Sequence, residues 1–295
     1  MDRAQRVAMG SIPVSLAALA MKTAGWWLTG SSAIFSDALE TLVNVAAAVL
    51  TLAALLLAVK PADENHPFGH AKAEFFAAVI EGALIVGAAA MILQEAWHVW
   101  RHAEPLTLSP LGIGLTLAGA VINGLWAFFL LRAGRETRSP ALAADGRHLM
   151  ADVLTSLGVV AGIGLVFITG LSELDPLLAA LVAVYILGSG FHLIRESVGG
   201  LMDEATDPAM LARIRAIVAE QAAGAIEAHD LRTRRAGRTT FLEFHLVVPG
   251  TMSVADAHVI CDRIEGALKS DLRGLIPTIH VEPEGKAKHH GVVVL

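Results

Sequence analysis

The feature that most constrains this chain is a series of long apolar segments between residues 9 and 200, interrupted by only a few polar stretches. A helix that spans a bilayer needs about 20 predominantly apolar residues. Six segments meet that requirement, and we expect spanning helices at 9–29, 32–58, 74–98, 109–132, 150–170 and 175–197. Hydrophobic residues make up 55% of the chain and charged residues only 17%, against about 25% charged in soluble domains. Residues 1–202 are therefore predicted to form an α-helical membrane domain.

The first apolar segment has one alternative interpretation. Arg3 and Arg6 precede it, as basic residues precede the apolar core of a signal peptide. The apolar run continues through Trp26 and Trp27, however, and five more such segments follow. We interpret it as the first membrane helix.

Basic residues predict the orientation, because cytoplasmic loops are enriched in Lys and Arg. If the segments alternate in direction, one side of the membrane receives nearly all of them, and the other side receives essentially Arg101. The residues on the first side are Arg3, Arg6, Lys60, Lys72, Arg132, Arg135, Arg138 and Arg147. We therefore expect a multi-pass protein of the inner (plasma) membrane with both termini in the cytoplasm.

The character of the chain changes after residue 203, where the pattern becomes that of a soluble domain. Residues 208–223 read as an amphipathic helix that begins with Asp207 as its cap and Pro208 in the first helical position. Two alternating segments, 225–235 and 239–248, are typical of strands. A second helix at 253–269, capped by Ser253, and a last strand at 276–283 complete an αββαβ order. This order predicts an α+β domain over 203–284 with both helices on one face of a three-stranded sheet, followed by a flexible tail at 285–295.

The charge and cysteine content limit the chemistry. The formal net charge is −6, which gives no indication of nucleic acid as a partner. Cys261 is the single cysteine, so neither a disulfide framework nor a cysteine-rich metal site is available. Any metal site must use Asp, Glu and the twelve histidines.

Ionisable and amide side chains occur inside two of the expected membrane helices. Asp37, Glu40 and Asn44 follow one another at spacings of three and four, which places them on one helix face. His148 and Asp152 are likewise one turn apart. Together Glu40, Asn44, His148 and Asp152 would provide the four ligands of a tetrahedral divalent site, although such groups can also serve only to pack a bundle. We interpret the weaker candidates Lys22 and Glu81 as structural or snorkelling groups.

Two further clusters lie outside the membrane segments. Asp63, His66 and His70 fall within eight residues of a short loop, where they could either chelate a metal or remain solvated. In the soluble domain, His229 and His245 lie on the two first strands and His258 on the second helix, while His280 and Glu282 share a face of the last strand. A metal site shared by these elements is the interpretation we favour.

The motifs resemble those of the cation diffusion facilitator family, the metal/proton antiporters, over nearly the whole chain. The segment that runs from Gly30 to Glu40 is similar to the family's second-helix signature. The loop 61–74 (PADENHPFGHAKAE) and the segment 228–234 (AHDLRTR) resemble those of bacterial zinc/proton antiporters.

This resemblance implies a homodimer in the lipid bilayer that works by alternating access, with a copper-chaperone-like cytoplasmic domain. It implies a transport site at Glu40, Asn44, His148 and Asp152, with Asp37 as a possible supplement, and a loop site at Asp63, His66 and His70. It implies a binuclear cytoplasmic site that ties the protomers together, with the ligands His229, His245, His258, His280 and Glu282. Lys72 and Asp203 match an interface charge pair.

The transport site departs from the pattern of the family's zinc members. Glu40 stands where they usually carry Asp or His, and Asn44 stands where they carry Asp. With neutral His148, the site therefore has two formal negative charges rather than three. Imidazole and oxygen ligands suit Zn²⁺, but also Fe²⁺, Co²⁺ and Mn²⁺.

The sequence thus predicts a transporter, not an enzyme, that exports Zn²⁺ or a related divalent cation from the cytoplasm in exchange for protons. The alternative is a membrane-anchored metal sensor or scaffold without transport. That alternative does not account for paired polar residues inside membrane helices.

Overall fold

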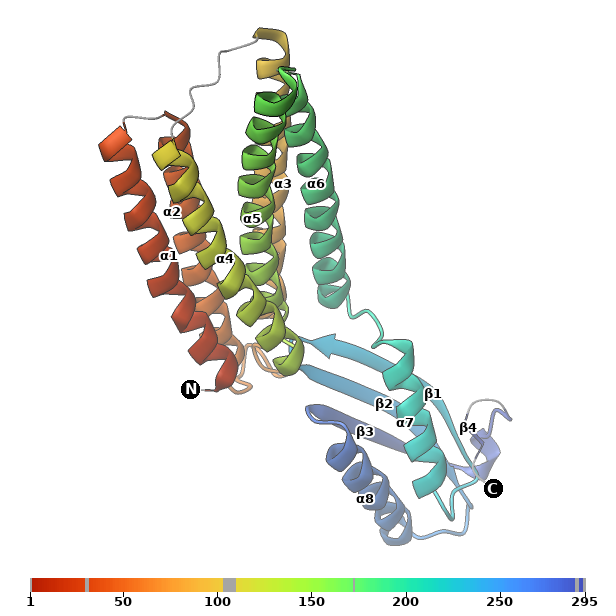
Figure 1. Cartoon of the computed structure of the whole chain (residues 1–295). Helices are drawn as coiled ribbons and strands as arrows, with labels where there is room; N and C mark the ends of the chain where they lie inside the picture. Colours follow the sequence, from red (N-terminus) through yellow and green to blue (C-terminus); the bar gives the residue numbers. More distant parts are fainter. Residues whose placement is uncertain (1, 30–31, 103–109, 172, 290–291, 294–295) are drawn as a thin grey trace. The chain divides into compact units, whose positions relative to one another are not determined.

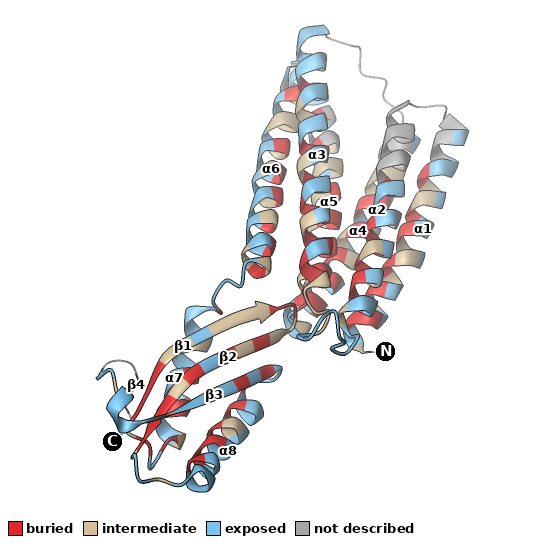
Figure 2. Cartoon of the chain, turned by 180° about the vertical axis from the view of Figure 1, so that it is seen from behind, coloured by how far each residue is buried: buried red, intermediate tan, exposed pale blue. Residues whose placement is uncertain are grey.

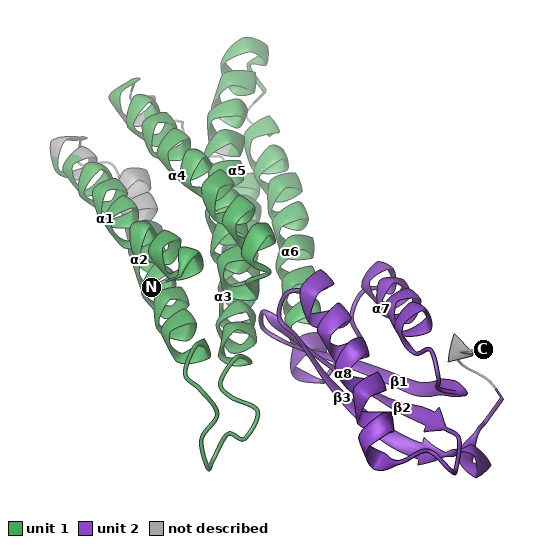
Figure 3. Ribbon diagram, turned by 90° about the horizontal axis from the view of Figure 1, so that it is seen from below, with its two compact units in different colours: residues 1–198 green, residues 199–295 purple. Residues whose placement is uncertain are grey.

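The computed structural model describes residues 2–29, 32–102, 110–171, 173–289 and 292–293. Contacts divide the chain into two compact units, Met1–Val198 and Gly199–Leu295 (Figure 3). The division falls within a few residues of the expected boundary at 202/203. Each unit is built around its own core.

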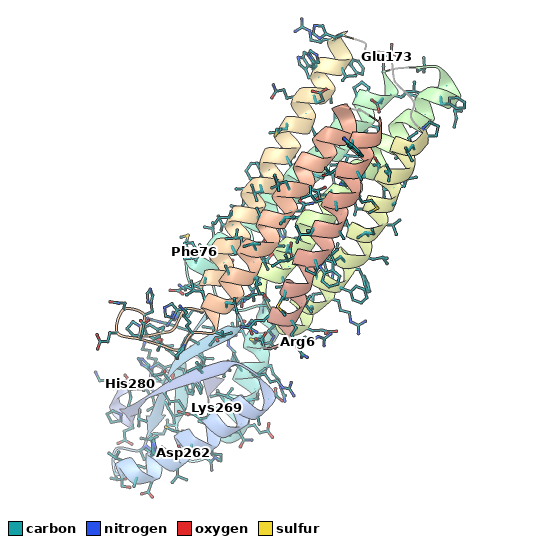
Figure 4. The ribbon with its side chains drawn as sticks, turned by 90° about the vertical axis from the view of Figure 1, so that its left-hand side faces the viewer. Arg6, Phe76, Glu173, Asp262, Lys269 and His280 are labelled. Carbon is teal, nitrogen blue, oxygen red and sulfur yellow. The ribbon has the colours of Figure 1, made fainter. Side chains whose placement is uncertain are left out.

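The first unit consists of six long helices, each long and apolar enough to cross a membrane (Figure 1). They are α1 (Arg3–Thr29), α2 (Ser32–Ala58), α3 (Ala73–His102), α4 (Pro110–Thr137), α5 (Pro140–Thr169) and α6 (Leu174–Leu201). The prediction of six spanning helices is confirmed. Arg6 and Glu173 mark the two ends of the bundle in Figure 4, and the α2–α3 loop lies at the Arg6 end (Figure 1); below, this is called the loop end.

Helix α5 begins ten residues earlier than the sequence predicts, at Pro140 rather than at 150. Ser139 caps it, since its side chain accepts a hydrogen bond from the backbone N–H of Leu142, and Pro140 suits the first turn because it needs no N–H partner. His148 therefore lies in the third turn and not at the start of the helix. This early start carries the polar segment 140–148 into the bundle.

Among the apolar clusters of the bundle, the two largest share α5. One joins residues of α1, α2, α4 and α5, among them Leu55 and Leu130. The other joins residues of α3, α5 and α6, among them Ile85 and Ile186. Large apolar side chains such as Phe128 and Phe167 are exposed, and Figure 2 shows exposed positions along the helices of the bundle. An apolar exterior of this kind suits lipid and not water.

The second unit contains α7 (Pro208–Gln221), β1 (Glu227–Ala236), β2 (Thr239–Val248), α8 (Val254–Asp271) and β3 (Leu275–Pro283). The αββαβ order and both predicted caps are confirmed: Asp207 accepts from the N–H of Met210, and Ser253 accepts from that of Asp256. Strand β2 pairs antiparallel with β1 and parallel with β3. Figure 1 shows α7 and α8 on the same face of this sheet.

Alternation along the strands separates the two faces of the sheet. Leu242, Phe244 and Leu246 of β2 are buried in one core with Ile214 of α7 and Ile264 of α8. The intervening positions of β2, including His245, lie on the opposite face.

The segment after β3, for which the sequence predicts a flexible tail, includes short regular elements among its described residues. It contains a short 3₁₀ helix, η1 (Glu284–Lys286), and a short strand, β4 (Val292–Val293). Strand β4 pairs with β1, so the sheet has the order β3-β2-β1-β4. The Val-Val run supplies the β propensity, and the free edge of β1 supplies the unpaired backbone groups.

Candidate metal centres

Three polar side chains meet where α2 contacts α5 inside the first unit. The Asn44 amide nitrogen donates a hydrogen bond to Asp152. The Nε2 atom of His148 lies 2.8 Å from the Asn44 Oδ1 atom. All three side chains are buried. The structure thus brings together three of the four residues that the sequence proposes for transport.

The orientation of the Asn44 amide determines the roles in this cluster. Because its nitrogen donates to Asp152, its oxygen faces His148 as an acceptor. The His148 Nε2 atom must then carry a proton and donate it. A metal ion bound to these three side chains would take the place of both hydrogen bonds, so metal binding here would have to break them.

The other two residues of the predicted site, Asp37 and Glu40, lie on α2 at one turn and more before Asn44. Their side chains lie outside the described part of the structure. Their helical spacing agrees with the face on which Asn44 lies, and their role in the site stays a prediction.

The α2–α3 loop gathers Asp63, His66 and His70. The Asp63 Oδ1 atom accepts hydrogen bonds from the backbone N–H groups of Asn65 and His66, at 3.0 and 2.7 Å. The ring nitrogens of His66 and His70 lie 3.2 and 3.4 Å from the Asp63 carboxylate. Gly69, at φ +80°, makes the turn that returns His70 to the aspartate. These ligand atoms lie close enough together to hold one metal ion.

The loop also favours an ionised Asp63. The hydrogen bond from the His66 backbone amide is the largest cause that lowers the pKa of this carboxyl, and the neighbouring imidazoles add to it. A metal ligand of the carboxylate type must be deprotonated. The backbone amide of His66 therefore helps to keep the Asp63 carboxyl group deprotonated, as a metal ligand must be, although the loop is exposed.

In the second unit, the sheet register aligns three histidines across neighbouring strands. His229 of β1 pairs with His245 of β2, which pairs with His280 of β3. Their ring centroids are 5.3 Å apart between His229 and His245, and 5.0 Å apart between His245 and His280. The next row across the sheet places Glu227, Val247 and Glu282 side by side.

Glu282 connects the histidines. One of its oxygens lies 3.3 Å from Nε2 of His229, and the other lies 3.3 Å from Nδ1 of His245 and 3.8 Å from Nε2 of His280. Both ring nitrogens of His229 and Nδ1 of His245 are buried, yet none has a hydrogen-bond partner among the described residues. Buried polar atoms that converge without hydrogen bonds fit a shared cation.

Two carboxylates beside this cluster were missed in the sequence. Glu227 is buried with an oxygen 3.2 Å from Nδ1 of His229, and Asp230 joins His229 and His245 as a possible ligand. The spacing of Glu227 and His229, two residues on one strand, could have indicated the first. Asp230 also accepts a hydrogen bond from Lys288 of the tail at 2.5 Å, which is the largest cause that lowers its pKa.

His258 does not join the cluster within this chain. It lies on α8, on the helical side of the sheet, with an exposed side chain 3.7 Å from Asp262. Figure 4 labels Asp262 on α8 and His280 on β3. A role for His258 in the same site would require a second protomer.

Of the predicted interface pair, Asp203 lies next to Arg234 of β1. Asp203, at φ +59°, has its carboxylate 3.7 Å from the guanidinium of Arg234. Lys72 lies in the first unit and Asp203 in the second. Their pairing across a dimer stays a prediction.

Comparison with known proteins places these features in a family. The family profile described as "Cation efflux transmembrane domain" matches residues 9–202, and that described as "Cation efflux protein, cytoplasmic domain" matches residues 206–284. The chain is 42% identical over 280 residues to the uncharacterized transporter sll1263 of Synechocystis, covering 95% of this chain and 90% of that protein. It is 34% identical over 265 residues to the cation-efflux pump FieF of Yersinia pestis, covering 90% of this chain and 88% of the pump.

Two solved structures are similar to part of this chain. One, titled as the zinc form of the putative zinc transporter CzrB, is 54% identical, covers 29% of this chain and 98% of its own, and has a TM-score of 0.28. The metal-bound C-terminal domain of the CzcD transporter from Thermotoga maritima is 30% identical over 28% of this chain and 100% of its own, with a TM-score of 0.26. The two profiles and the near full-length relatives show that this chain belongs to the cation diffusion facilitator family of cation efflux transporters.

Proposed function

We propose that this chain exports a divalent transition metal, with Zn²⁺ as the first candidate, in exchange for protons. The observation that carries the proposal is the buried cluster of Asn44, His148 and Asp152 between α2 and α5. A charged side chain at the centre of a membrane helix costs about 3 kcal/mol on insertion scales. A cluster that holds an amide, an imidazole and a carboxylate there is explained by a cation that they bind.

The ligand set and the similar proteins both bear on which metal is transported. Glu40, one turn from Asn44, would complete a four-ligand set of oxygen and nitrogen atoms. A protein described as a putative zinc transporter and a cation-efflux pump are among the similar proteins. Fe²⁺, Co²⁺ and Mn²⁺ accept the same ligand types, and Asn44 lowers the charge of the set relative to a carboxylate.

Proton exchange follows from the chemistry of the ligands. Metal binds to deprotonated carboxylates and to an imidazole nitrogen that has lost its proton, so loading releases protons. His148 is the first candidate for coupling, because an unperturbed imidazole titrates near neutral pH. If His148→Ala kept the full pH dependence of transport, this assignment would be wrong.

The test is metal uptake into proteoliposomes with Zn²⁺, Fe²⁺, Co²⁺ and Mn²⁺ compared under a pH gradient. We expect metal uptake accompanied by proton movement in the opposite direction, with Zn²⁺ or a related ion preferred. Asp152→Ala should abolish both. Metal binding without uptake of any of the four ions would favour the membrane-anchored sensor instead.

We also propose regulatory metal sites on the loop and in the second unit, and a homodimer. The loop set is Asp63, His66 and His70, and the sheet set is His229, His245, His280 and Glu282. His258 would then reach the sheet cluster of a second protomer. Zinc counting on native protein and on His258→Ala tests this: loss of bound zinc supports a shared site, and an unchanged zinc count removes His258 from it.

The basic residues at the loop end of the bundle support an orientation with that end, and both termini, in the cytoplasm. Accessibility of a cysteine introduced at Glu64 of the loop, with Cys261 replaced, tests the orientation. If a membrane-impermeant reagent labelled this cysteine from outside intact cells, the loop end would lie outside the cytoplasm and the proposed orientation would be wrong.

A further inference from the structure

The buried cluster of Asn44, His148 and Asp152, the proposed transport site, is called the transport cluster below. A second buried polar group lies between it and the loop end of the bundle. Glu81 of α3 is 0% exposed, and Asp145 of α5 is 1% exposed. The two carboxyl groups interact electrostatically across the helix interface. The sequence interprets Glu81 as a structural or snorkelling group, but a fully buried side chain cannot snorkel.

Hydroxyl groups from two other helices partner this pair. Thr51 of α2 donates a hydrogen bond to the Oε1 atom of Glu81. Ser11 of α1 donates to the Oδ2 atom of Asp145 at 3.0 Å, and is itself held by the Trp126 Nε1–H at 2.8 Å. The Oε2 atom of Glu81 is buried and has no hydrogen-bond partner among the described residues. One carboxyl oxygen of Glu81 is thus buried without the hydrogen bond that a carboxylate oxygen requires.

The charges around the pair favour a bound proton. Among the described residues, the titratable groups that face these carboxyls are each other and, for Asp145, His148 on its own helix. Helices α1 and α2 contribute hydroxyls, and α6 packs against the neighbouring Gly82 through the apolar Ile194. Two carboxylates without an adjacent Lys or Arg cannot both stay ionised in a medium of low dielectric constant.

The position of the pair relates it to transport. Thr51 follows Asn44 by seven residues on α2, which is about 10 Å along a helix. Glu81 follows the first residue of α3 by eight residues, or about 12 Å from the loop end. Glu81 and its partner Thr51 therefore lie about two turns from Asn44 and about two turns from the loop end, while Asp145 lies three residues, less than one turn, before His148 on α5. The pair thus lies between the metal ligands and the loop end, on the route by which a proton released during metal loading would leave.

We propose that Glu81 is a proton-binding residue of the transport cycle and that it forms, with Asp145, a buried proton site separate from the metal site. This inference rests on the proposed metal/proton exchange. When a divalent cation enters the transport cluster, the O–H bond of Glu81 breaks, the proton passes to water at the loop end, and the carboxylate charge remains to offset the cation. When the metal leaves on the opposite side, the carboxylate takes up a proton again.

The test uses full-length protein in proteoliposomes, with Zn²⁺ as the probe and proton movement measured inside the vesicles. Gln resembles a protonated Glu, so Glu81→Gln should fold, bind zinc and transport it, but exchange about one proton fewer per metal ion. Glu95→Gln makes the same change on the exposed surface of α3 and should exchange protons as the native chain does. An unchanged proton-to-metal ratio in Glu81→Gln would overturn the proposal.

Infrared difference spectroscopy on zinc addition gives a second measurement. The native chain should lose the carbonyl band of a protonated carboxylic acid, and Glu81→Gln should lack that change while Glu95→Gln keeps it. If the number of bound zinc ions fell in Glu81→Gln with the proton ratio intact, the pair would be a metal site and the proposal would be wrong. If the native chain moved zinc without protons, the proposed exchange itself would fail, whatever Glu81 does.

Discussion

At the scale of single residues, Asn44 has the largest consequence for what the buried cluster of Asn44, His148 and Asp152 can do. Its amide donates to Asp152 and accepts from His148, so it links the two other described members of the cluster. A carboxylate at this position could not donate to Asp152 and would instead repel it. The amide therefore stabilises the metal-free cluster at the expense of charge available to a metal.

We expect Asn44→Asp to bind divalent metal more tightly and to make metal loading more dependent on pH. The third carboxylate adds a stronger ligand and a group that must lose a proton first. The measurement is zinc affinity and transport at several pH values, with Asn123→Asp as a control for a new acidic group in the buried part of another helix. Weaker zinc binding in Asn44→Asp than in the native chain would contradict this account.

At the scale of elements, glycines determine how closely the helices of the bundle approach. A methyl group at Gly190 of α6 would lie 2.8 Å from a carbon of Val86 and 3.2 Å from the Gly82 carbonyl oxygen of α3. Backbone cannot move aside as a flexible side chain can. This contact holds α3, the helix that carries Glu81, against α6.

Gly190→Ala should therefore lower the thermal unfolding midpoint of the protein in detergent. Overpacking of a tight site costs about 1–3 kcal/mol. Gly188→Ala is the matched control, because a methyl group there meets nothing within 4 Å. Equal midpoints for the two variants would show that α3 and α6 are not in close contact.

The helices of the second unit are linked by a salt bridge that is sensitive to acid. Arg213 of α7 makes two hydrogen bonds to the Asp271 carboxylate at the end of α8, at 2.9 and 2.7 Å. The hydrogen bond from Arg213 is the largest cause that lowers the pKa of Asp271. A carboxyl with a lowered pKa in the folded state contributes stability above its ordinary pKa, and this is lost as the pH falls through the folded value.

We therefore expect the native chain to become less stable in acid as Asp271 is protonated and its salt bridge with Arg213 is lost. The stability of Asp271→Asn should depend less on pH over the same range, because it lacks this carboxyl group. Thermal unfolding followed at a series of pH values down to the ordinary pKa of aspartate and below measures the effect. Arg215→Ala, on the exposed side of the same helix α7, should keep the native pH profile. A profile for Asp271→Asn identical to the native one would show that the pair contributes nothing.

At the scale of the whole molecule, metal binding and stability are linked. A ligand that binds only the folded state stabilises it by about 2.7 kcal/mol at a concentration one hundred times its dissociation constant. The sheet cluster exists only when β1, β2 and β3 are aligned, because each contributes one histidine. Zinc should therefore raise the unfolding temperature of the second unit, and a chelator should lower it again.

Glu282→Gln should reduce this zinc-dependent stabilisation, since its carboxylate lies beside all three histidines. We expect a loss of roughly tenfold or more in the affinity of the cluster. Glu284→Gln, just beyond the end of β3, should retain the native response. Scanning calorimetry of the full chain with and without zinc distinguishes the two, and an undiminished zinc response in Glu282→Gln would remove Glu282 from the site.

Much of the architecture follows from patterns that are local in the chain. Six apolar segments of sufficient length specify six membrane helices, because no other structure satisfies every backbone polar group of one segment in lipid. The same local rules placed the caps Asp207 and Ser253. They also placed Asn44, His148 and Asp152 as candidates, since an ionisable group in an apolar segment is conspicuous wherever it occurs.

Tertiary structure decided which of these residues meet, because contacts between helices or strands depend on register and packing that no single segment encodes. It separated His258 from the strand histidines, since α8 covers the other face of the sheet. It brought Glu227 into their neighbourhood, and it paired β4 with the edge of β1. It also set Glu81 against Asp145 across the helix interface, 64 positions apart in the chain. The sequence by itself thus determined the membrane helices, the soluble fold and most candidate ligands, while helix packing and strand register decided which carboxyls and imidazoles lie close enough to share a cation.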